Sequence, residues 1–99
     1  MEIIYSAQAE MNLNEVFDYG VENWGVDRAA SFVSFLQDEI DILTEFPELG
    51  KRYENDYIML SEGLRALDID NYKTIYRLGK NLIEIVSILP KGRPLLSPS

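Results

Sequence analysis

The sequence predicts a two-layer α+β domain in which an antiparallel helical hairpin packs on an antiparallel sheet. A short β-prone segment opens the chain at Glu2–Tyr5, two amphipathic stretches follow within residues 6–46, and three β-prone segments fill residues 63–89. The first segment is too short to stand alone, so it is expected to join the sheet as a fourth strand. The expected order is β-α-α-β-β-β, and with 99 residues the chain forms one domain, residues 1–99.

The first helix is expected to begin after Ser6, because the Ser6 hydroxyl can accept a hydrogen bond from a free amide in the first turn. Apolar residues then recur at the spacing of one helix face, while acidic residues fall mostly on the other side. The helix should end at Gly25, which can adopt the left-handed conformation. The apolar face consists of Ala9, Leu13, Val16, Phe17, Gly20 and Trp24.

A second helix is expected with Asp27 as its N-cap, after a link of only about two residues, which forces an antiparallel hairpin. Pro47 ends the helical pattern, and Gly50 follows it closely. The apolar stripe consists of Ala29, Phe32, Val33, Leu36, Ile40 and Leu43.

Two segments show no regular period. Residues 47–62 are expected to form a crossing loop, with an irregular strand near Tyr57–Leu60. The last ten residues, PKGRPLLSPS, hold three prolines and a glycine, which predict an irregular tail over residues 90–99. Leu95 and Leu96 in this tail are expected to dock, either on this domain or on a partner.

The remaining segment predicts three strands joined by tight turns. The turns are expected at Asp70-Asn71 and at Gly79-Lys80-Asn81. The strands are expected over Leu64–Ile69, Tyr72–Leu78 and Leu82–Leu89, which are rich in β-branched and aromatic residues.

The second turn sets the strand register, and an uninterrupted ladder then separates two faces. One face pairs Leu78 with Ile83, Tyr76 with Ile85 and Tyr72 with Leu89. The opposite face pairs Arg77 with Glu84, Ile75 with Val86 and Lys73 with Ile88. Because one face is apolar and the other is half charged, the strands are expected to be covered on one side only.

The charge of the chain is unevenly distributed. Residues 1–50 hold 11 acidic and one basic side chain, whereas residues 51–99 hold 6 acidic and 8 basic ones, and the net charge is −8. This asymmetry argues against the binding of a nucleic acid over the whole surface, because phosphate attraction needs a net basic footprint. We expect no direct DNA binding by this chain, although a local basic patch on the C-terminal half is allowed.

No part of the sequence has the character of a targeting or membrane segment. The first residues lack the basic region and apolar core of a signal peptide, and no apolar run approaches the roughly 18 residues of a span. A cytoplasmic protein without membrane association is expected.

The residue counts exclude most catalytic chemistries. The chain contains no His and no Cys, so imidazole bases, thiol nucleophiles and the zinc sites built on them are absent. No Gly-rich loop precedes a helix in the way that a phosphate cradle requires. Carboxylate pairs such as Asp38 with Glu39 lie on a solvated helix face. We therefore predict no catalytic, cofactor-binding or metal-binding residues.

Basic residues around the sheet are the remaining candidates for function. Arg77 has two interpretations, since it can form a cross-strand ion pair with Glu84 or present its guanidinium to an anionic partner. The set consists of Lys51, Arg52, Arg65, Lys73, Arg77, Lys91 and Arg93.

The order of these parts resembles the ParE/RelE toxin superfamily, especially its ParE branch. Six features carry the resemblance: S-x-x-A-x-x-N-L-x-x-V at Ser6–Val16, Tyr19 with Trp24-Gly25, F-P-E-L-G at Phe46–Gly50, G-L-R at Gly63–Arg65, Y-x-x-I-Y-R at Tyr72–Arg77 and I-E-I-V-x-I-L at Ile83–Leu89. The resemblance implies the toxin of a bacterial type II toxin–antitoxin pair. Such a toxin is neutralised by a small antitoxin whose tail wraps it and whose other end binds DNA.

This superfamily holds two functional classes. RelE-like members cut messenger RNA in the ribosome with basic side chains and often a C-terminal Tyr or His, whereas ParE-like members lack that set and poison DNA gyrase by protein contact. Arg65 and Arg77 lie where RelE-like enzymes place phosphate-stabilising arginines. The sequence departs from the family after the last strand, because Pro90 stands where a His is common, and Pro94 replaces an Asp after the retained Arg93.

Cleavage by 2′-hydroxyl attack needs a proton acceptor as well as phosphate clamps. Tyr76 or Glu84 could serve, but Tyr76 is expected to face the core. The missing C-terminal base therefore favours binding over catalysis.

The sequence thus predicts a ParE-like toxin that inhibits DNA gyrase, is not an enzyme and needs no cofactor. The alternatives are a ribosome-dependent messenger RNA endonuclease of RelE type and a repurposed, non-toxic fold that still binds its partner. The antitoxin is expected to lay apolar and acidic residues across the sheet and the groove beside the helices. The predicted partner-binding residues are Arg65, Lys73, Arg77, Arg93, Leu95 and Leu96.

Overall fold

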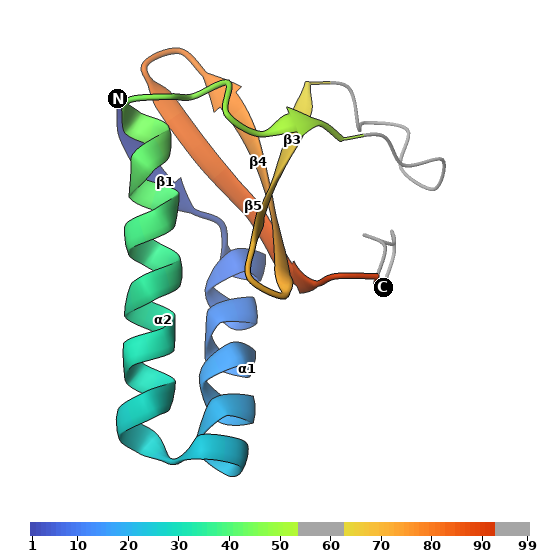
Figure 1. Cartoon of the computed structure of the whole chain (residues 1–99). Coiled ribbons are helices and arrows are strands. Elements are labelled where there is room, and N and C mark those ends of the chain that lie inside the picture. The colour runs from blue at the N-terminus through green and yellow to red at the C-terminus, as the bar shows by residue number, and fades with distance from the viewer. Residues whose placement is uncertain (54–62, 93–99) are drawn as a thin grey trace.

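The computed structural model describes residues 1–53 and 63–92. It has two layers, a five-stranded sheet and a helical hairpin that packs on one face of this sheet (Figure 1). The helices are α1 (Ala7–Trp24), α2 (Val26–Asp41) and the short 3-10 helix η1 (Ile42–Thr44). The strands are β1 (Glu2–Tyr5), β2 (Lys51–Arg52), β3 (Leu64–Ile69), β4 (Tyr72–Gly79) and β5 (Leu82–Pro90). The predicted α+β fold class is confirmed.

The helical hairpin forms as predicted, with one change at its corner. Ser6 is the N-cap of α1, and its Oγ accepts a hydrogen bond from the Ala9 amide at 3.0 Å. Gly25, at a φ of 92°, is the single residue between the two helices. Because the carbonyl of Gly25 already accepts the first bond of α2, from Ala29 N, Gly25 caps both helices. Asp27 therefore lies in the first turn of α2. The prediction that Asp27 is the N-cap of this helix is wrong.

The two helices approach each other most closely beside Gly20. A Cβ added at this position would lie 2.9 Å from the Ala29 Cβ, so only glycine allows this contact. Within the described residues, no helix has both the length and the apolar character needed to cross a membrane.

The sheet has the strand order β1-β5-β4-β3-β2. The meander of β3, β4 and β5 is antiparallel as predicted, whereas β1 pairs with β5 in parallel. This direction brings Ser6 beside β5, where its amide donates to the Ile85 carbonyl at 3.0 Å. At the other edge, β2 pairs with β3 inside a segment predicted to be a loop. The strand predicted near Tyr57–Leu60 lies outside the described residues.

The register between β4 and β5 changes at a β-bulge. Three predicted pairs next to the turn are confirmed: Leu78 with Ile83, Arg77 with Glu84 and Tyr76 with Ile85. Val86 is then an extra residue on β5, so the observed pairs are Ile75 with Ser87, Lys73 with Leu89 and Tyr72 with Pro90. The predicted pairs of Ile75 with Val86, Lys73 with Ile88 and Tyr72 with Leu89 are therefore wrong by one residue. Pro90 belongs to β5 and not to the irregular tail.

Two side chains at the start of α1 stabilise the bulge. β1 ends opposite Ile85, and beyond this residue no strand of residues 1–53 and 63–92 pairs with β5 on that side. There the Ser6 hydroxyl donates to the Val86 carbonyl at 2.8 Å, and Asn12 Oδ1 accepts from the Ile88 amide at 3.0 Å. The backbone groups that the bulge frees are thus satisfied by the helix.

The hairpin and the sheet face beneath it share one core. Its buried members are Ala9, Val16, Leu36, Ile40, Leu43, Ile69, Tyr76, Ile83, Ile85 and Ile88. The bulge turns Ile88 into this core. The opposite sheet face holds a smaller apolar cluster of Leu64, Ile75 and Leu89, against which Tyr53, Ala66 and Val86 pack.

Candidate functional site

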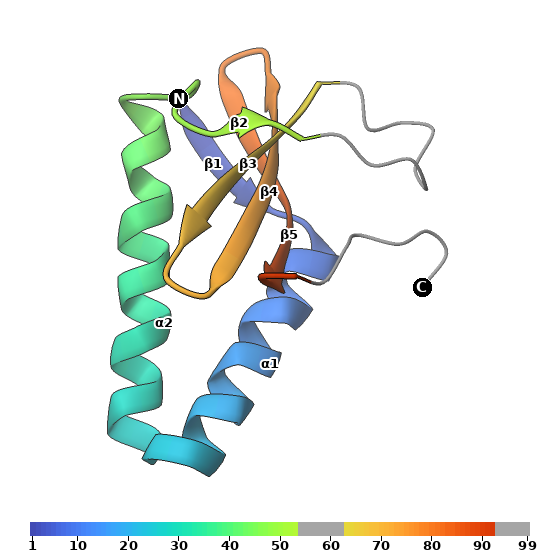
Figure 2. The ribbon, with the colours of Figure 1, turned by 45° about the vertical axis from the view of Figure 1, so that its right-hand side comes forward.

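A groove of about 570 Å³ lies between α1 and the end of the sheet where β3 turns into β4. The hairpin extends past this β3–β4 turn in both views of the ribbon, so part of each helix has no strand beneath it (Figures 1 and 2). Asn12 and Glu15 line the groove from α1, while Tyr72 and Pro90 line it from the sheet. We call this feature the aromatic groove.

Aromatic rings from three elements form one continuous wall of the aromatic groove. The Trp24 ring packs edge-on against Tyr19 at 6.1 Å and against Phe32 at 5.7 Å between centroids. Phe32 in turn contacts Tyr72 of β4 at 5.9 Å. Burial raises the pKa of the Tyr72 phenol. Trp24 is nevertheless 40 % exposed and Tyr19 56 % exposed, so two large rings of this wall face solvent.

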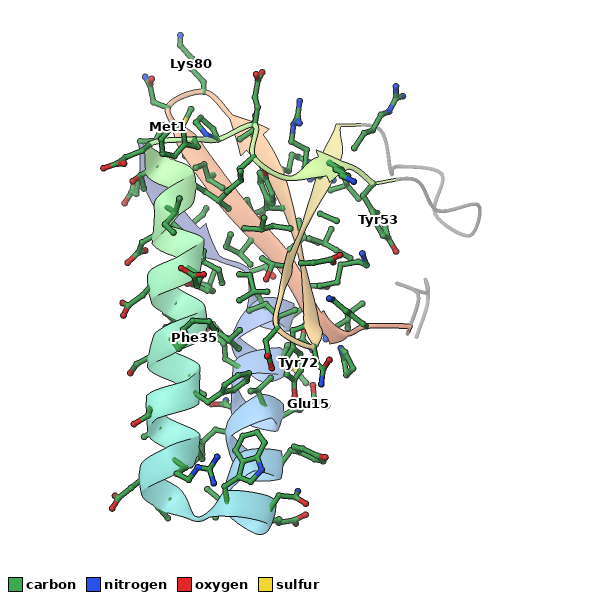
Figure 3. All side chains as sticks on the ribbon, in the orientation of Figure 1. Met1, Glu15, Phe35, Tyr53, Tyr72 and Lys80 are labelled. Carbon is green, nitrogen blue, oxygen red and sulfur yellow. The ribbon has the colours of Figure 1, made fainter. Side chains whose placement is uncertain are left out.

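The charged residues of the aromatic groove are mostly acidic. Glu15 lines it from α1, and Asp70 lines it from the β3–β4 turn; Glu15 and Tyr72, which both line the groove, are labelled in Figure 3. Lys91 is the only Lys or Arg among the described residues that line it. Arg28 lies outside, with its guanidinium 5.8 Å from the centre of the Trp24 ring.

Sequence reasoning did not identify the aromatic groove. It assigned Trp24 to the apolar face of the first helix and Tyr72 to the covered face of the sheet, and it included Asn12 only as part of the Ser6–Val16 motif. Two large aromatic residues close to the predicted end of the first helix, Tyr19 and Trp24, are the sequence signal that could have indicated this surface. The opposite wall comes from residues about 50 positions further along the chain, so helix periodicity could not reveal the groove.

Arg65 does not lie on the open face of the sheet with Arg77. It pairs with Tyr76 across β3 and β4, and opposite residues of a pair point to the same side, which here is the helix side. Its Nη1 donates to the Gly50 carbonyl at 2.8 Å and to the Glu48 carbonyl at 3.4 Å. The guanidinium therefore anchors the turn that follows Pro47.

Tyr76 anchors the same turn from below. Its hydroxyl donates to the Pro47 carbonyl at 2.7 Å and accepts from the Gly50 amide at 2.8 Å, and the side chain is fully buried, as predicted. Burial raises the pKa of this phenol, so it keeps its proton. A Cβ added at Gly50 would lie 2.6 Å from the Tyr76 ring, which explains the glycine of the F-P-E-L-G motif.

Lys73 and Arg77 lie on the sheet face away from the helices, and each has a cross-strand partner. Lys73 Nζ lies 2.9 Å from Asp68 Oδ1, and its hydrogen bond holds the pKa of that carboxyl below the usual value. Arg77 Nη1 lies 3.6 Å from Glu84 Oε1, so the predicted ion pair is present. The other predicted partner-binding residues, Arg93, Leu95 and Leu96, lie outside the described residues.

Comparison with known proteins decides the family. The profile of the family described as "ParE toxin of type II toxin-antitoxin system, parDE" matches residues 3–95. The chain belongs to the ParE toxin family. It is 31% identical to Toxin ParE1 of Caulobacter vibrioides over 84 residues, which cover 85% of this chain and 82% of that protein. It is 29% identical to Toxin ParE1 of Mycobacterium tuberculosis over 87 residues, or 87% of this chain and 85% of that protein.

The fold of this ParE-family chain is also that of a solved structure. The structure titled "Chromosomal ParDE TA system from P. aeruginosa" superimposes with a TM-score of 0.76 at 18% identity, covering 91% of this chain and 95% of that one. The family match and the curated relatives confirm the resemblance to the ParE branch, and this structure confirms the fold. Two of its motifs have a structural reason in this ParE-family chain: Ser6–Val16 holds the bulge of β5, and Phe46–Gly50 forms the turn on Tyr76.

Proposed function

We propose that this ParE-family chain is the toxin of a type II toxin–antitoxin pair, that it acts in the cytoplasm by binding DNA gyrase, and that it catalyses no reaction. The family match supports the toxin role. The gyrase target rests on the resemblance to the ParE branch, whose members act by protein contact.

The observation that carries the proposal is the state of Arg65 and Tyr76. In an endonuclease of RelE type these residues would act as phosphate clamp and proton acceptor. Here the Arg65 guanidinium donates to the Gly50 carbonyl, and the Tyr76 hydroxyl is fully buried and bonded to Pro47 and Gly50. A general base must reach the proton that it removes, and this phenol reaches only its own chain.

Glu84 supports the same conclusion. It is the other candidate for a proton acceptor, and it lies on the far face of the sheet, 3.6 Å from the Arg77 guanidinium. Arg65 and Arg77 point to opposite faces, so they do not converge on one phosphate. RNA cleavage therefore has neither its clamp nor its base among these residues.

The proposed antitoxin covers two surfaces of this chain. One is the aromatic groove, whose exposed rings offer apolar anchors. The other is the sheet face that carries Lys73 and Arg77, where acidic residues of the antitoxin would bind these two cations. The antitoxin would also contact Arg93, Leu95 and Leu96 of the tail. The solved relative from P. aeruginosa is itself titled a ParDE system, which supports a partner of this kind.

Induction of this chain in bacteria that lack its partner tests the function. Filamentation with DNA-damage signalling is expected if the chain poisons gyrase. Rapid loss of translation would instead indicate messenger RNA cleavage, and normal growth would indicate a repurposed fold, so each of these results contradicts the proposal. Co-expression of the small protein encoded beside this gene is expected to restore growth.

A direct assay identifies the target. Purified chain added to DNA gyrase is expected to inhibit supercoiling of relaxed plasmid, and the partner protein is expected to reverse the inhibition. Ribosomes programmed with a messenger RNA form the parallel assay. Cleavage of that transcript, lost in an Arg65→Ala or Glu84→Gln variant, would overturn the binding mechanism.

A further inference from the structure

We propose that the segment which occupies the aromatic groove is apolar and basic, with two or more apolar anchors flanked by Lys or Arg. The inference rests on the proposed function for the identity of the partner, the antitoxin. It also differs from the expectation that the antitoxin is acidic wherever it contacts this chain.

The apolar requirement follows from the exposed rings. Tyr19 and Trp24 leave about half of their surface in water, although each lines a recess large enough for several side chains. Phe32 and Tyr72 continue the aromatic wall of that recess through ring contacts. Burying such rings is favourable in proportion to the apolar area covered, so apolar anchors of a partner have a defined place.

The basic requirement follows from the flank of α1. Glu15, Asp18 and Glu22 are spaced three and four residues apart, so they lie in one row along the helix, next to Tyr19. Glu15 lines the groove itself, and Asp70 lines the opposite wall. A segment in the groove therefore has carboxylates on both sides. Lys91 is the one cation among the described residues that line the groove.

These carboxylates have no partner cation of their own. Within the described residues, none of Glu15, Asp18, Glu22 and Asp70 forms an ion pair, and Glu15 accepts a hydrogen bond from the uncharged Asn12 amide at 3.0 Å. Asp68 and Glu84 on the far sheet face are already paired with Lys73 and Arg77. Carboxylates without an ion pair therefore border this groove, where cations of a partner can complement them.

A second copy of this chain does not fit the same surface. Its net charge is −8, and residues 7–44, which form the helical layer, carry eight carboxylates and one cation. Like charges that face each other across an interface cost free energy. Charge therefore selects a basic segment over self-association.

A pair of synthetic peptides tests the inference. Both have fifteen residues with leucines at the same helical spacing, and one carries four lysines where the other carries four glutamates. Titration into the full chain is followed by the fluorescence of Trp24, its single tryptophan. The lysine peptide is expected to bind at least about tenfold more tightly at low ionic strength, and to lose about tenfold in affinity at high salt.

Two charge variants of the chain locate the effect. The triple variant Glu15→Gln, Asp18→Asn, Glu22→Gln is expected to bind the lysine peptide at least about tenfold more weakly. The control Asp38→Asn, Asp41→Asn, Glu45→Gln removes the same number of charges from exposed positions elsewhere and is expected to change affinity less than about twofold. Equal losses in both variants, equal affinity for both peptides, or a dimer of the free chain in sedimentation would overturn the inference.

Peptide titration does not depend on toxicity, so the two proposals fail separately. A chain that harms no cell but prefers the lysine peptide loses the proposed function and keeps this inference. A toxic chain that prefers the glutamate peptide loses this inference alone.

Discussion

Asn12 of α1 accepts a hydrogen bond at its Oδ1 from the backbone amide of Ile88 in β5, at 3.0 Å. Its Nδ2 donates to Glu15 Oε1, also at 3.0 Å, and the residue is 5% exposed. The Asn12 side chain therefore joins α1, which carries the row of Glu15, Asp18 and Glu22, to β5 at a point just beyond the bulge of that strand. The position of that row relative to the sheet depends on this link.

Replacing Asn12 by Leu is expected to lower the free energy of unfolding by about 1–3 kcal/mol, because the buried amide of Ile88 loses its acceptor. Urea denaturation measures the change. The matched control is Asn14→Leu on the exposed side of the same helix, where a change below about 0.5 kcal/mol is expected. Equal costs in the two variants would contradict the role given to the Asn12–Ile88 bond.

The same bond explains which part of the sheet could be predicted from the sequence. The central part of each described strand, the turn at Asp70-Asn71 and the pairs next to the second turn depend on local residues, and they are confirmed, although Gly79 belongs to β4 and not to that second turn. The bulge at Val86 depends on Ser6 and Asn12, which lie more than 70 positions away in the chain. No pattern within β4 and β5 reveals such a bond, so the predicted register failed beyond Ile85.

Tyr76→Phe is expected to lower the free energy of unfolding by about 1–3 kcal/mol, because the variant leaves the Gly50 amide and the Pro47 carbonyl without their partner. Thermal or urea denaturation measures the loss. Tyr72→Phe is the control, since its hydroxyl has no hydrogen-bond partner among the described residues, and it is expected to cost less than about 0.5 kcal/mol. If both variants were equally stable, the Tyr76 hydroxyl would not anchor the turn.

The candidate site was harder to predict than the fold. Basic residues were selected because charge on a half-covered sheet suggests a partner, yet Arg65 serves its own chain at Gly50. The aromatic groove was missed because only tertiary packing brings Tyr19 and Tyr72 to the same groove. Composition showed that the first half is acidic, but not that three carboxylates follow the rim of one groove.

Gly20→Ala is expected to destabilise the hairpin by about 1–3 kcal/mol, because the new Cβ would meet the Ala29 Cβ at 2.9 Å. In an Ala29→Gly background the same change should cost little, since alanine favours the helix by about 1 kcal/mol over glycine. Denaturation of the four proteins of this cycle gives the coupling energy. An Ala30→Gly background, at an exposed position next to Ala29, should leave the full cost of Gly20→Ala.

Tyr5 gives the chain a pH dependence in alkali. Burial, with a smaller effect of Asp41, raises its pKa from the ordinary value of 10.0 to about 12. The unfolded chain then loses this proton first, so the free energy of unfolding is expected to fall as the pH rises from about 10 to about 12. Tyr5→Phe should reduce this slope. The difference in phenolate absorbance between the two proteins should have its midpoint near pH 12, the raised pKa of Tyr5. A midpoint near the ordinary value of 10.0 would contradict the assignment.

Arg65→Ala and Arg77→Ala are expected to separate stability from partner binding. Arg65 donates to a backbone carbonyl at 2.8 Å, so its loss should lower the free energy of unfolding by about 1–2 kcal/mol. Arg77 belongs to a half-exposed pair at 3.6 Å, which contributes less than about 1 kcal/mol.

If the antitoxin lies on the sheet face that carries Arg77, Arg77→Ala should weaken antitoxin binding severalfold while the fold keeps its stability. Calorimetric titration with the small protein encoded beside this gene measures the affinity. Unchanged affinity would leave Arg77 as a cross-strand partner of Glu84 alone and confine antitoxin recognition to other surfaces.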